Sequence, residues 1–400
     1  MRNVVIVDAC RTAVGSFGGS LRPLKADALA RAVMIAALER TGLEPGQVDE
    51  IFLGHCRQSS DCSNTARYAA LLAGIPETVP ASTVMCACAS GMLAVNCGFN
   101  AIRTGQDQVV LAGGTESMSN AIFYLSDARW GVGTGTTQLK DSLTEAQFCS
   151  QPQDIYGRFN MGITAENIAA KMGITREEQD RFALASQEKA RAAIAAGRFK
   201  DEIVPLTVPQ GRKKPDKIFD TDEFPRETSL ELLSRLKPAF LPPDGTVTAG
   251  NSSGRNDGAS MLVLMDAQLA EEQGLKPLAR ILGVASAGVN PRYMGLGPVP
   301  ATQKALEMAG LRLDDIQLIE LNEAFAAQSI GCIRELGLQD RMGIINVNGG
   351  PIALGHPIGS GSRILVTLVH EMNKRGLRYG LATLCIAGGM GMATVVETVQ

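Results

Sequence analysis

The stretch ALERTGLEPGQVDEIFLG, at residues 37–54, has a counterpart in ALEMAGLRLDDIQLIELN, at residues 305–322. In both copies a helical pattern stops at a glycine, Gly42 or Gly310, which is the usual residue just past a helix end. A short polar loop and a strand-like apolar run then follow. The sequence therefore predicts that one helix–loop–strand unit occurs twice in this chain.

A second pair of stretches repeats in the same order, QVVLAGG at 108–114 and TLCIAGG at 383–389. Because two matched pairs in one order are hard to obtain by chance, we expect two related halves. Short apolar strands, such as VVIVDA at 4–9, alternate with helical patterns, such as residues 26–41, which is typical of an α/β fold. Residues 121–254 break this alternation, and such an insertion is expected to lie over the site that it serves.

Composition excludes several classes of function. The chain has 400 residues, 45% of them hydrophobic, which is enough for more than one packed core. A formal net charge of -3 is too small to favour nucleic acid or an anionic membrane as a partner. No apolar run reaches the ~18 residues that span a bilayer, and the N-terminus lacks the cleavage site of a signal peptide. The nine cysteines are scattered, without a paired framework, so we expect a reduced, cytoplasmic protein. The chain has only three histidines, which argues against a multi-histidine metal site.

The segment TVMCACASGM, at residues 83–92, places Cys86 and Cys88 just before a helical pattern that ends near Arg103. The positive end of a helix favours the thiolate, which is the nucleophilic form of cysteine, so Cys88 is a candidate nucleophile. Two alternatives stand beside this interpretation. Cys88 could be a small buried hydrophobic residue, as most cysteines are. It could also belong to a metal clip, but the sequence has no second CxC or CxxC pattern to supply further ligands.

Three further stretches place polar groups in glycine-rich loops or at strand ends. NVNGGPIALGHPIGSGSRI, at 346–364, holds His356 near a helix start. LNEAFAAQ puts Asn322 and Glu323 after a strand, where α/β sites gather, although a helix cap and helix-end charge would explain them equally well. Cys385 ends the strand of LATLCIAGGMGMA. The other two histidines are given no catalytic role: His370 is interpreted as a structural residue, and His55 as a surface or packing residue.

Together these stretches resemble the thiolase family. A cysteine before A-S-G-M, then N-E-A-F, G-H-P-x-G and C-x-x-G-G-M-G, occur in the family's order, and the resemblance covers essentially the whole chain. It implies an α/β fold of two similar βαβαβαββ halves, forming a five-layered α-β-α-β-α core with an inserted loop domain. The implied N-terminal half is 1–120 plus 255–274, the loop domain for coenzyme A binding and oligomer contacts is 121–254, and the C-terminal half is 275–400.

The resemblance also implies an acyltransferase, most like the acetyl-CoA acetyltransferase type. Such an enzyme cleaves a 3-ketoacyl-CoA thiolytically or, in reverse, condenses two acetyl-CoA to acetoacetyl-CoA through an acyl-cysteine. Cys88 matches the nucleophile, His356 its base, Asn322 the holder of an oxyanion-hole water, and Cys385 the second, acid/base thiol. The backbone N–H groups of Cys88 and Ala387 match a further oxyanion hole, and one such donor is typically worth ~3–4 kcal/mol.

Coenzyme A, acetyl-CoA, acetoacetyl-CoA and other 3-ketoacyl-CoA are the implied substrates, with no separate cofactor and no metal. The implied partner is a second copy of the chain, in a homodimer or, more often for this type, a homotetramer, with no nucleic acid and no membrane. The basic run GRKKPDK, at 211–217, would meet coenzyme A phosphates or form a solvated loop. Nine positions match residues that line a coenzyme A tunnel, although core packing would explain the apolar ones: Met161, Arg226, Leu236, Phe240, Ala249, Ser253, Met294, Ala324 and Phe325.

The sequence departs from the family pattern at a few positions. Asn160 stands where short-chain members usually have histidine, Ala387 stands for a usual glycine, and the loop after His356 is one residue shorter than usual. Alternatives therefore stay open: a broader-chain 3-ketoacyl-CoA thiolase of β-oxidation, a catalytically silent acyl-CoA or lipid-binding member, and a Cys-His protease. The chain keeps the complete set of two cysteines, a histidine and an asparagine, which argues against a silent binding protein and against a protease.

Overall fold

A mixed sheet of 11 strands organises the computed structural model, which describes residues 1–211 and 214–399. Its main path runs β13-β14-β15-β12-β1-β11-β5-β3-β4, while β2 pairs with β11 and β8 with β1. The elements of the first half are β1 (Val4–Thr12), β2 (Gly15–Ser16), α1 (Ala26–Thr41), β3 (Glu50–His55), α2 (Thr65–Leu72), β4 (Ala81–Val84), α3 (Ser90–Thr104), β5 (Val109–Ser117) and β11 (Asn256–Asp266).

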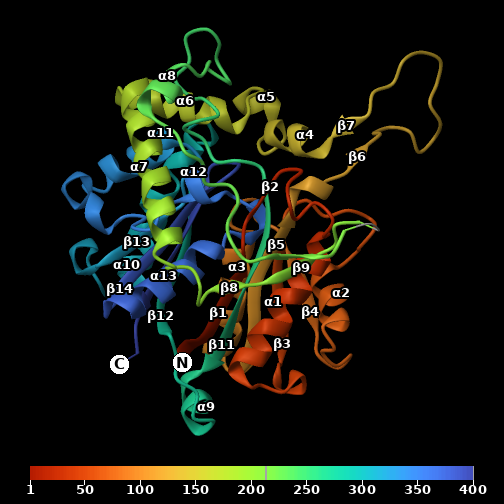
Figure 1. Cartoon of the computed structure of the whole chain (residues 1–400), viewed down its shortest axis with the longest axis vertical. Helices are drawn as coiled ribbons and strands as arrows, with labels where there is room; N and C mark the ends of the chain where they lie inside the picture. The colour runs from red at the N-terminus through yellow and green to blue at the C-terminus, as the bar shows by residue number, and fades with distance from the viewer. Residues whose placement is uncertain (212–213, 400) are drawn as a thin grey trace.

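The second half follows a short helix, α9 (Ala267–Glu272), that lies near both termini in Figure 1. Its elements are β12 (Ala279–Gly288), α10 (Pro298–Ala309), β13 (Leu318–Leu321), α11 (Ala326–Glu335), α12 (Pro351–Leu354), α13 (Arg363–Arg375), β14 (Tyr379–Ile386) and β15 (Met390–Glu397). The sequence-predicted strand at 4–9 and helix at 26–41 are confirmed, and the repeated units correspond to α1–β3 and α10–β13.

The order of strands has an internal symmetry. From the middle outward, β1-β11-β5-β3 on one side corresponds to β12-β15-β14-β13 on the other. Strands β1 and β12 join the two sides, with Val5 paired to Arg280 and Ile6 to Ala279. In each half the outer pairing, β3 with β5 or β13 with β14, is parallel. The duplication seen in the sequence thus produces two matching half-sheets.

Three apolar clusters explain the layers. One cluster packs α1 and α2 on the outer face of the first half-sheet. A second places α3 and α13 between the two half-sheets, with Phe99 and Leu365 fully buried. The third packs α10 and α11 on the outer face of the second half-sheet. The result is a five-layered arrangement. The parallel strands end at one end of the molecule, and both central helices, α3 and α13, begin at that same end.

Much of the segment between β5 and β11 covers that end, at the top of Figure 1, while its longest helix and two of its short strands extend down over the side of the molecule. It contains β6 (Phe123–Tyr124), β7 (Lys140–Asp141), α4 (Ser142–Phe148), α5 (Gln153–Tyr156), α6 (Met161–Met172), α7 (Arg176–Ala195), β8 (Ile203–Val204), β9 (Leu206–Val208), β10 (Lys217–Phe219) and α8 (Leu230–Ser234). Glu166 of α6 accepts hydrogen bonds from the backbone N–H groups of Thr246 and Val247, which ties this helix to the segment leading into β11. Among the described helices, none combines the length and the apolar character needed to cross a bilayer.

Candidate active site

A cavity of about 430 Å³ lies where the inserted segment meets loops of both halves. Cys88 and His356 line it together, from the approaches to the two central helices, and Ala387 lines it from the turn after β14. Its other lining residues include six of the nine predicted coenzyme A contacts: Met161, Phe240, Ser253, Met294, Ala324 and Phe325. The cavity therefore brings a thiol, an imidazole and a largely apolar slot to one place.

The turn that carries Cys88 is held in an unusual conformation. Ala87 has a φ of 44°, in the left-handed region that non-glycine residues rarely adopt. Ser90 closes the turn, because its hydroxyl donates to the Ala87 carbonyl at 2.7 Å and accepts from the Cys86 N–H at 2.9 Å. Gly361 packs against the backbone here, and a Cβ at that position would lie 2.1 Å from the Cys88 carbonyl oxygen. The nucleophile candidate and the His356 loop are thus in direct contact.

The Cys88 thiol is protonated in the free protein. Burial raises its pKa to about 12, and the nearby thiol of Cys385 acts in the same direction. The Arg57 charge and the Ala387 N–H, which hydrogen-bonds the sulfur, lower the pKa without cancelling the burial effect. The start of α3 favours the thiolate, as expected from the sequence, but removal from water acts in the opposite direction and is the larger influence on this pKa. The proton must leave during the reaction, which requires a base.

His356 is suited to accept that proton. Burial, together with the positive charge of Arg363, lowers its pKa to about 4, so the imidazole is neutral at pH 7. Asn256 fixes the loop, because its side-chain oxygen accepts the His356 backbone N–H at 2.9 Å and its amide donates to the Gly15 carbonyl. The Nε2 atom of His356 is buried and has no hydrogen-bond partner in residues 1–211 and 214–399. It is therefore available to a substrate.

Cys385 and Asn322 lie behind the cavity wall. Cys385 is the next-to-last residue of β14 and is fully buried, which raises its pKa to about 12, while the neighbouring Asn322 side chain opposes the rise. Asn346 pins the strand end before Asn322, because its side chain exchanges two 2.8 Å hydrogen bonds with the Leu321 backbone. Ala387 avoids the left-handed conformation, which falls on Gly388 and Gly389. Alanine in place of the usual glycine therefore introduces no backbone strain.

Sequence reasoning missed the residue that joins the two loops of the site. Glu116, at the end of β5, is fully buried, and its carboxylate accepts the backbone N–H groups of Cys56, Arg57 and Gly359 at 3.0–3.2 Å. His55 also contacts it, with 3.3 Å between Nε2 and Oε1. Glu116 lies in GGTESMSNA, at residues 113–121, a stretch that also resembles the thiolase family, but its partners come from loops far apart in the chain.

The predicted coenzyme A contacts fall into two groups. Ser253 is placed beside Ala324, because its N–H donates to the Ala324 carbonyl at 3.0 Å. The rings of Phe240 and Phe325 meet edge to face, with 5.9 Å between their centroids. Three predicted contacts lie outside the cavity lining, on the exposed surface of the inserted segment: Arg226, Leu236 and Ala249. The Arg226 guanidinium donates to the Ala249 carbonyl at 2.9 Å.

Asn160 and the basic run 211–217 differ in their relation to the cavity. Asn160 lines the cavity and caps α6, because its side-chain oxygen accepts the Ile163 N–H at 3.1 Å. An asparagine in place of the usual histidine therefore still begins this helix. In the basic run 211–217, Arg212 and Lys213 lie outside the described residues, and the run does not line the cavity elsewhere.

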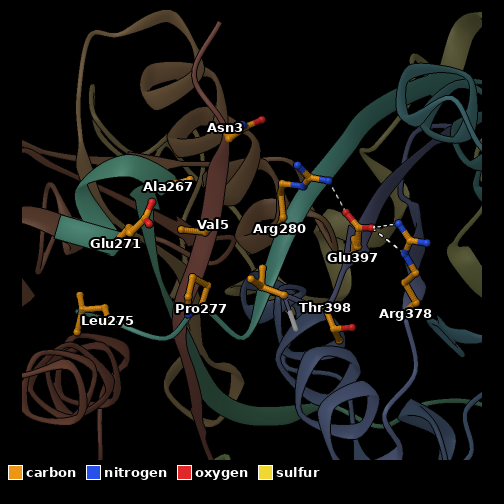
Figure 2. Close-up of a pocket in the computed structure, with 11 residues that line it drawn as sticks. Asn3, Val5, Ala267, Glu271, Leu275, Pro277, Arg280, Arg378, Glu397 and Thr398 are labelled. Atoms are coloured by element: carbon orange, nitrogen blue, oxygen red, sulfur yellow. Dashed lines mark hydrogen bonds and ion pairs between the residues drawn. The ribbon is translucent and has the colours of Figure 1, made fainter. Parts of the chain in front are cut away.

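A larger cavity, of about 540 Å³, lies at the opposite end of the molecule (Figure 2). Its charged groups neutralise one another, because Glu397 pairs with Arg280 and with Arg378, the latter at 2.8 Å. It holds neither a cysteine nor a histidine. Within residues 1–211 and 214–399, no three His, Cys, Asp or Glu side chains cluster closely enough to hold a metal ion. Of these two cavities, the smaller one therefore offers the thiol and the imidazole needed for nucleophilic chemistry.

Comparison with known proteins agrees with this geometry. The sequence model described as "Thiolase, N-terminal domain" matches residues 4–268, and that described as "Thiolase, C-terminal domain" matches residues 275–398. An acetyl-CoA acetyltransferase of Pseudomonas aeruginosa is 54% identical over 395 residues, which cover 98% of each chain.

Solved structures are also similar over the full length. The crystal structure of the Bacillus anthracis acetyl-CoA acetyltransferase superposes with a TM-score of 0.95 at 46% identity, covering 100% of this chain and 99% of that one. Human mitochondrial 3-ketoacyl-CoA thiolase, in complex with CoA, superposes with a TM-score of 0.93 at 41% identity, covering 100% and 98%.

Proposed function

The chain belongs to the thiolase family, and from this premise we propose that it exchanges acetyl or longer acyl groups between coenzyme A thioesters through Cys88. It is an acyltransferase, as its relatives at about 50% identity indicate. The proposed reaction is reversible: thiolytic cleavage of a 3-ketoacyl-CoA, or condensation of two acetyl-CoA to acetoacetyl-CoA. The observation that carries the proposal is the shared cavity of Cys88, His356 and Ala387, with Cys385 directly behind it.

Acylation begins with the attack of the Cys88 sulfur on the 3-keto carbon. His356 takes the thiol proton as the bond forms, which fits a neutral imidazole beside a protonated thiol. The backbone N–H groups of Cys88 and Ala387 stabilise the tetrahedral oxyanion. The bond between C2 and C3 then breaks, leaving an acyl group on sulfur and the enolate of acetyl-CoA.

The enolate leaves after it gains a proton. We propose that two groups stabilise the enolate oxygen: His356 Nε2 directly, and the Asn322 amide through a water. Both nitrogen atoms are buried and have no hydrogen-bond partner among the described residues. Cys385 gives its proton to the enolate carbon and later takes the proton of an incoming coenzyme A thiol. That thiolate attacks the acyl carbon, the bond to Cys88 breaks, and the Cys88 sulfur regains the proton that His356 holds. Coenzyme A and acyl-CoA are substrates, so the reaction requires no further cofactor.

Coenzyme A is proposed to enter along the apolar slot. Six of the nine matched residues line the cavity, which supports a pantetheine arm packed against the contacting rings of Phe240 and Phe325. Arg226, Leu236 and Ala249 lie outside it on the surface of the same inserted segment, so they are proposed to meet the outer, nucleotide end of coenzyme A. The cation of Arg226 supports this, because it matches a phosphate in charge.

Thiolysis of 3-ketoacyl-CoA substrates of increasing length tests which acyl chain the enzyme prefers. We expect kcat/KM to be highest for acetoacetyl-CoA and to fall at least ~10-fold by eight carbons, since the cavity must also hold the pantetheine arm. A flat profile would instead favour the second candidate, a 3-ketoacyl-CoA thiolase of β-oxidation, which the similar human structure supports. Absence of thiolysis for every length would contradict the proposed function itself.

A homo-oligomer, more often a tetramer than a dimer, is proposed for the assembly. Strand β4 stands at one edge of the sheet, and such edges are common pairing surfaces. The projecting arm around β6 and β7 carries Phe123 and Trp130, which are 64% and 93% exposed (Figure 1). Light scattering should give four times the 42.3-kDa chain mass, and Trp130→Glu should yield dimers. A monomeric wild-type protein would contradict this proposal.

Two organisational proposals accompany the function. The chain is proposed to divide into an N-terminal half, 1–120 plus 255–274, a loop domain, 121–254, and a C-terminal half, 275–400. The half-sheets and the segment above them support this division. The protein is proposed to be cytoplasmic. In support, the described cysteines are all free thiols, as expected for a reducing compartment.

A further inference from the structure

Arg57 is a charged residue in the catalytic cavity to which the reaction above gives no role. It follows β3 and lines the same cavity as Cys88 and His356. It also lines a neighbouring cavity of about 160 Å³, so its side chain lies in the wall between the two. Its positive charge is close enough to Cys88 to oppose the rise of that thiol's pKa. A cation therefore stands at the acyl end of the site.

The backbone of Arg57 is fixed, while its guanidinium is uncompensated. Glu116 accepts the Arg57 N–H at 3.2 Å, but the hydrogen bonds of its carboxylate go to backbone groups and to His55. The Nε atom of Arg57 is buried without a hydrogen-bond partner, and no ion pair joins Arg57 to a carboxylate within residues 1–211 and 214–399. Asp61, in the neighbouring cavity, instead contacts Lys25 at 3.4 Å. A buried, unpaired donor of this kind is costly unless a ligand satisfies it.

The other arginines of the catalytic cavity and of the cavity in Figure 2 differ from Arg57, because each of them has a carboxylate partner. Arg255 lines the catalytic cavity too, but its guanidinium lies 3.8 Å from the Asp141 carboxylate and donates to Thr144 at 3.4 Å. In the cavity of Figure 2, Arg280 and Arg378 share Glu397. Arg57 is thus the arginine of the catalytic cavity whose charge is left for a ligand.

We propose that Arg57 recognises a carboxylate at the far end of the acyl chain, so that the preferred substrates include short 3-oxoacyl-CoA thioesters that end in a carboxylate. This inference rests on the proposed function and names a substrate class for the same site. The geometry is favourable because the matched coenzyme A contacts come from the inserted segment and the second half, whereas Arg57 and Cys88 come from the first half. A guanidinium binds a carboxylate through two parallel hydrogen bonds, which gives both affinity and orientation.

The chemistry is unchanged by the extra group. Cys88 attacks the 3-oxo carbon, the C2–C3 bond breaks, and acetyl-CoA leaves after its enolate is protonated. The carboxylate-bearing acyl group remains on sulfur and passes to the thiol of coenzyme A, giving a dicarboxylic acid mono-thioester. The carboxylate takes no part in bond making, so its contact with Arg57 should act mainly through KM.

The test compares two probes of equal carbon number in thiolysis: 3-oxohexanedioyl-CoA, which ends in a carboxylate, and 3-oxohexanoyl-CoA, which ends in a methyl group. The quantity measured is the ratio of their kcat/KM values on one enzyme preparation, so that any loss of folded protein cancels. We expect the wild-type ratio to exceed 1 and to fall about 10- to 100-fold in Arg57→Met. Arg57→Lys should keep part of the preference, and Arg255→Met, the matched control, should keep the ratio within about threefold.

Each outcome decides the point. A wild-type enzyme that cleaves the neutral probe but not the carboxylate probe overturns the role of Arg57 and leaves the proposed function intact. The same follows if Arg57→Met has the wild-type ratio, or if Arg255→Met lowers the ratio as much. Cleavage of neither probe by the wild-type enzyme contradicts the proposed function, and this inference falls with it.

Discussion

Replacing Cys88 by serine is expected to lower the thiolysis rate by about 10⁴-fold or more and to abolish the acyl-enzyme. The hydroxyl has nearly the size of the thiol, so Ser90 and Gly361 can still hold the turn. However, a hydroxyl is far more difficult to deprotonate than a thiol, and His356, whose pKa is lowered to about 4, is too weak a base to compensate. Mass spectrometry after incubation with acetyl-CoA is the direct measurement, because it detects the acetyl adduct itself.

Cys86→Ser provides the matched control. Cys86 lies two residues away, is also partly exposed, and does not line the cavity. Its variant should keep the adduct and stay within about threefold of the wild-type rate. An acetyl adduct that persists in Cys88→Ser would refute the assignment of the nucleophile, and one that disappears in Cys86→Ser would transfer that role to Cys86.

Most of this site could be placed from sequence because it depends on repeated local units. The duplicated pattern identified α1–β3 and α10–β13, and the order of the motifs then placed Cys88, His356 and Cys385 at the ends of corresponding elements. In a parallel arrangement the ends of neighbouring strands meet at one edge, so residues distant in the chain become neighbours. The structure brings these three side chains to one cavity and its wall.

Features of the site that depend on burial and on long-range contacts could not be predicted from the sequence. The start of α3 favours a thiolate at Cys88, whereas burial raises the pKa of the thiol, and the extent of burial depends on every loop that covers the site. Glu116 and Asn256 act through backbone N–H groups of loops that only the tertiary fold brings near them. Arg57 carries no motif signal, because a lone arginine after a strand is usually a solvated residue. Only its unpaired position in the cavity wall sets it apart.

Replacing Cys385 by alanine should separate the two halves of the reaction. Cys88 and His356 remain, so an acetyl group should still reach Cys88 from acetyl-CoA. Exchange of the acetyl methyl protons with solvent should fall at least ~10³-fold, because the group that moves a proton to and from that carbon is gone. Deuterium incorporation into acetyl-CoA, measured by mass spectrometry, reports the second step, and the acetyl adduct reports the first.

Cys332→Ala is the matched control, because it tests whether removing any buried thiol in this region abolishes exchange at the acetyl methyl group. Cys332 is also fully buried, in an apolar cluster next to the one that holds Cys385, and the substitution removes the same sulfur atom. Its S–H donates to the Gly295 carbonyl at 3.0 Å, so it is held away from proton transfer. We therefore expect Cys332→Ala to lose stability but to keep exchange at the acetyl methyl group. If Cys385→Ala exchanged normally, or if both variants lost exchange equally, the effect would come from packing, and the acid/base role would have to move to another group such as His356.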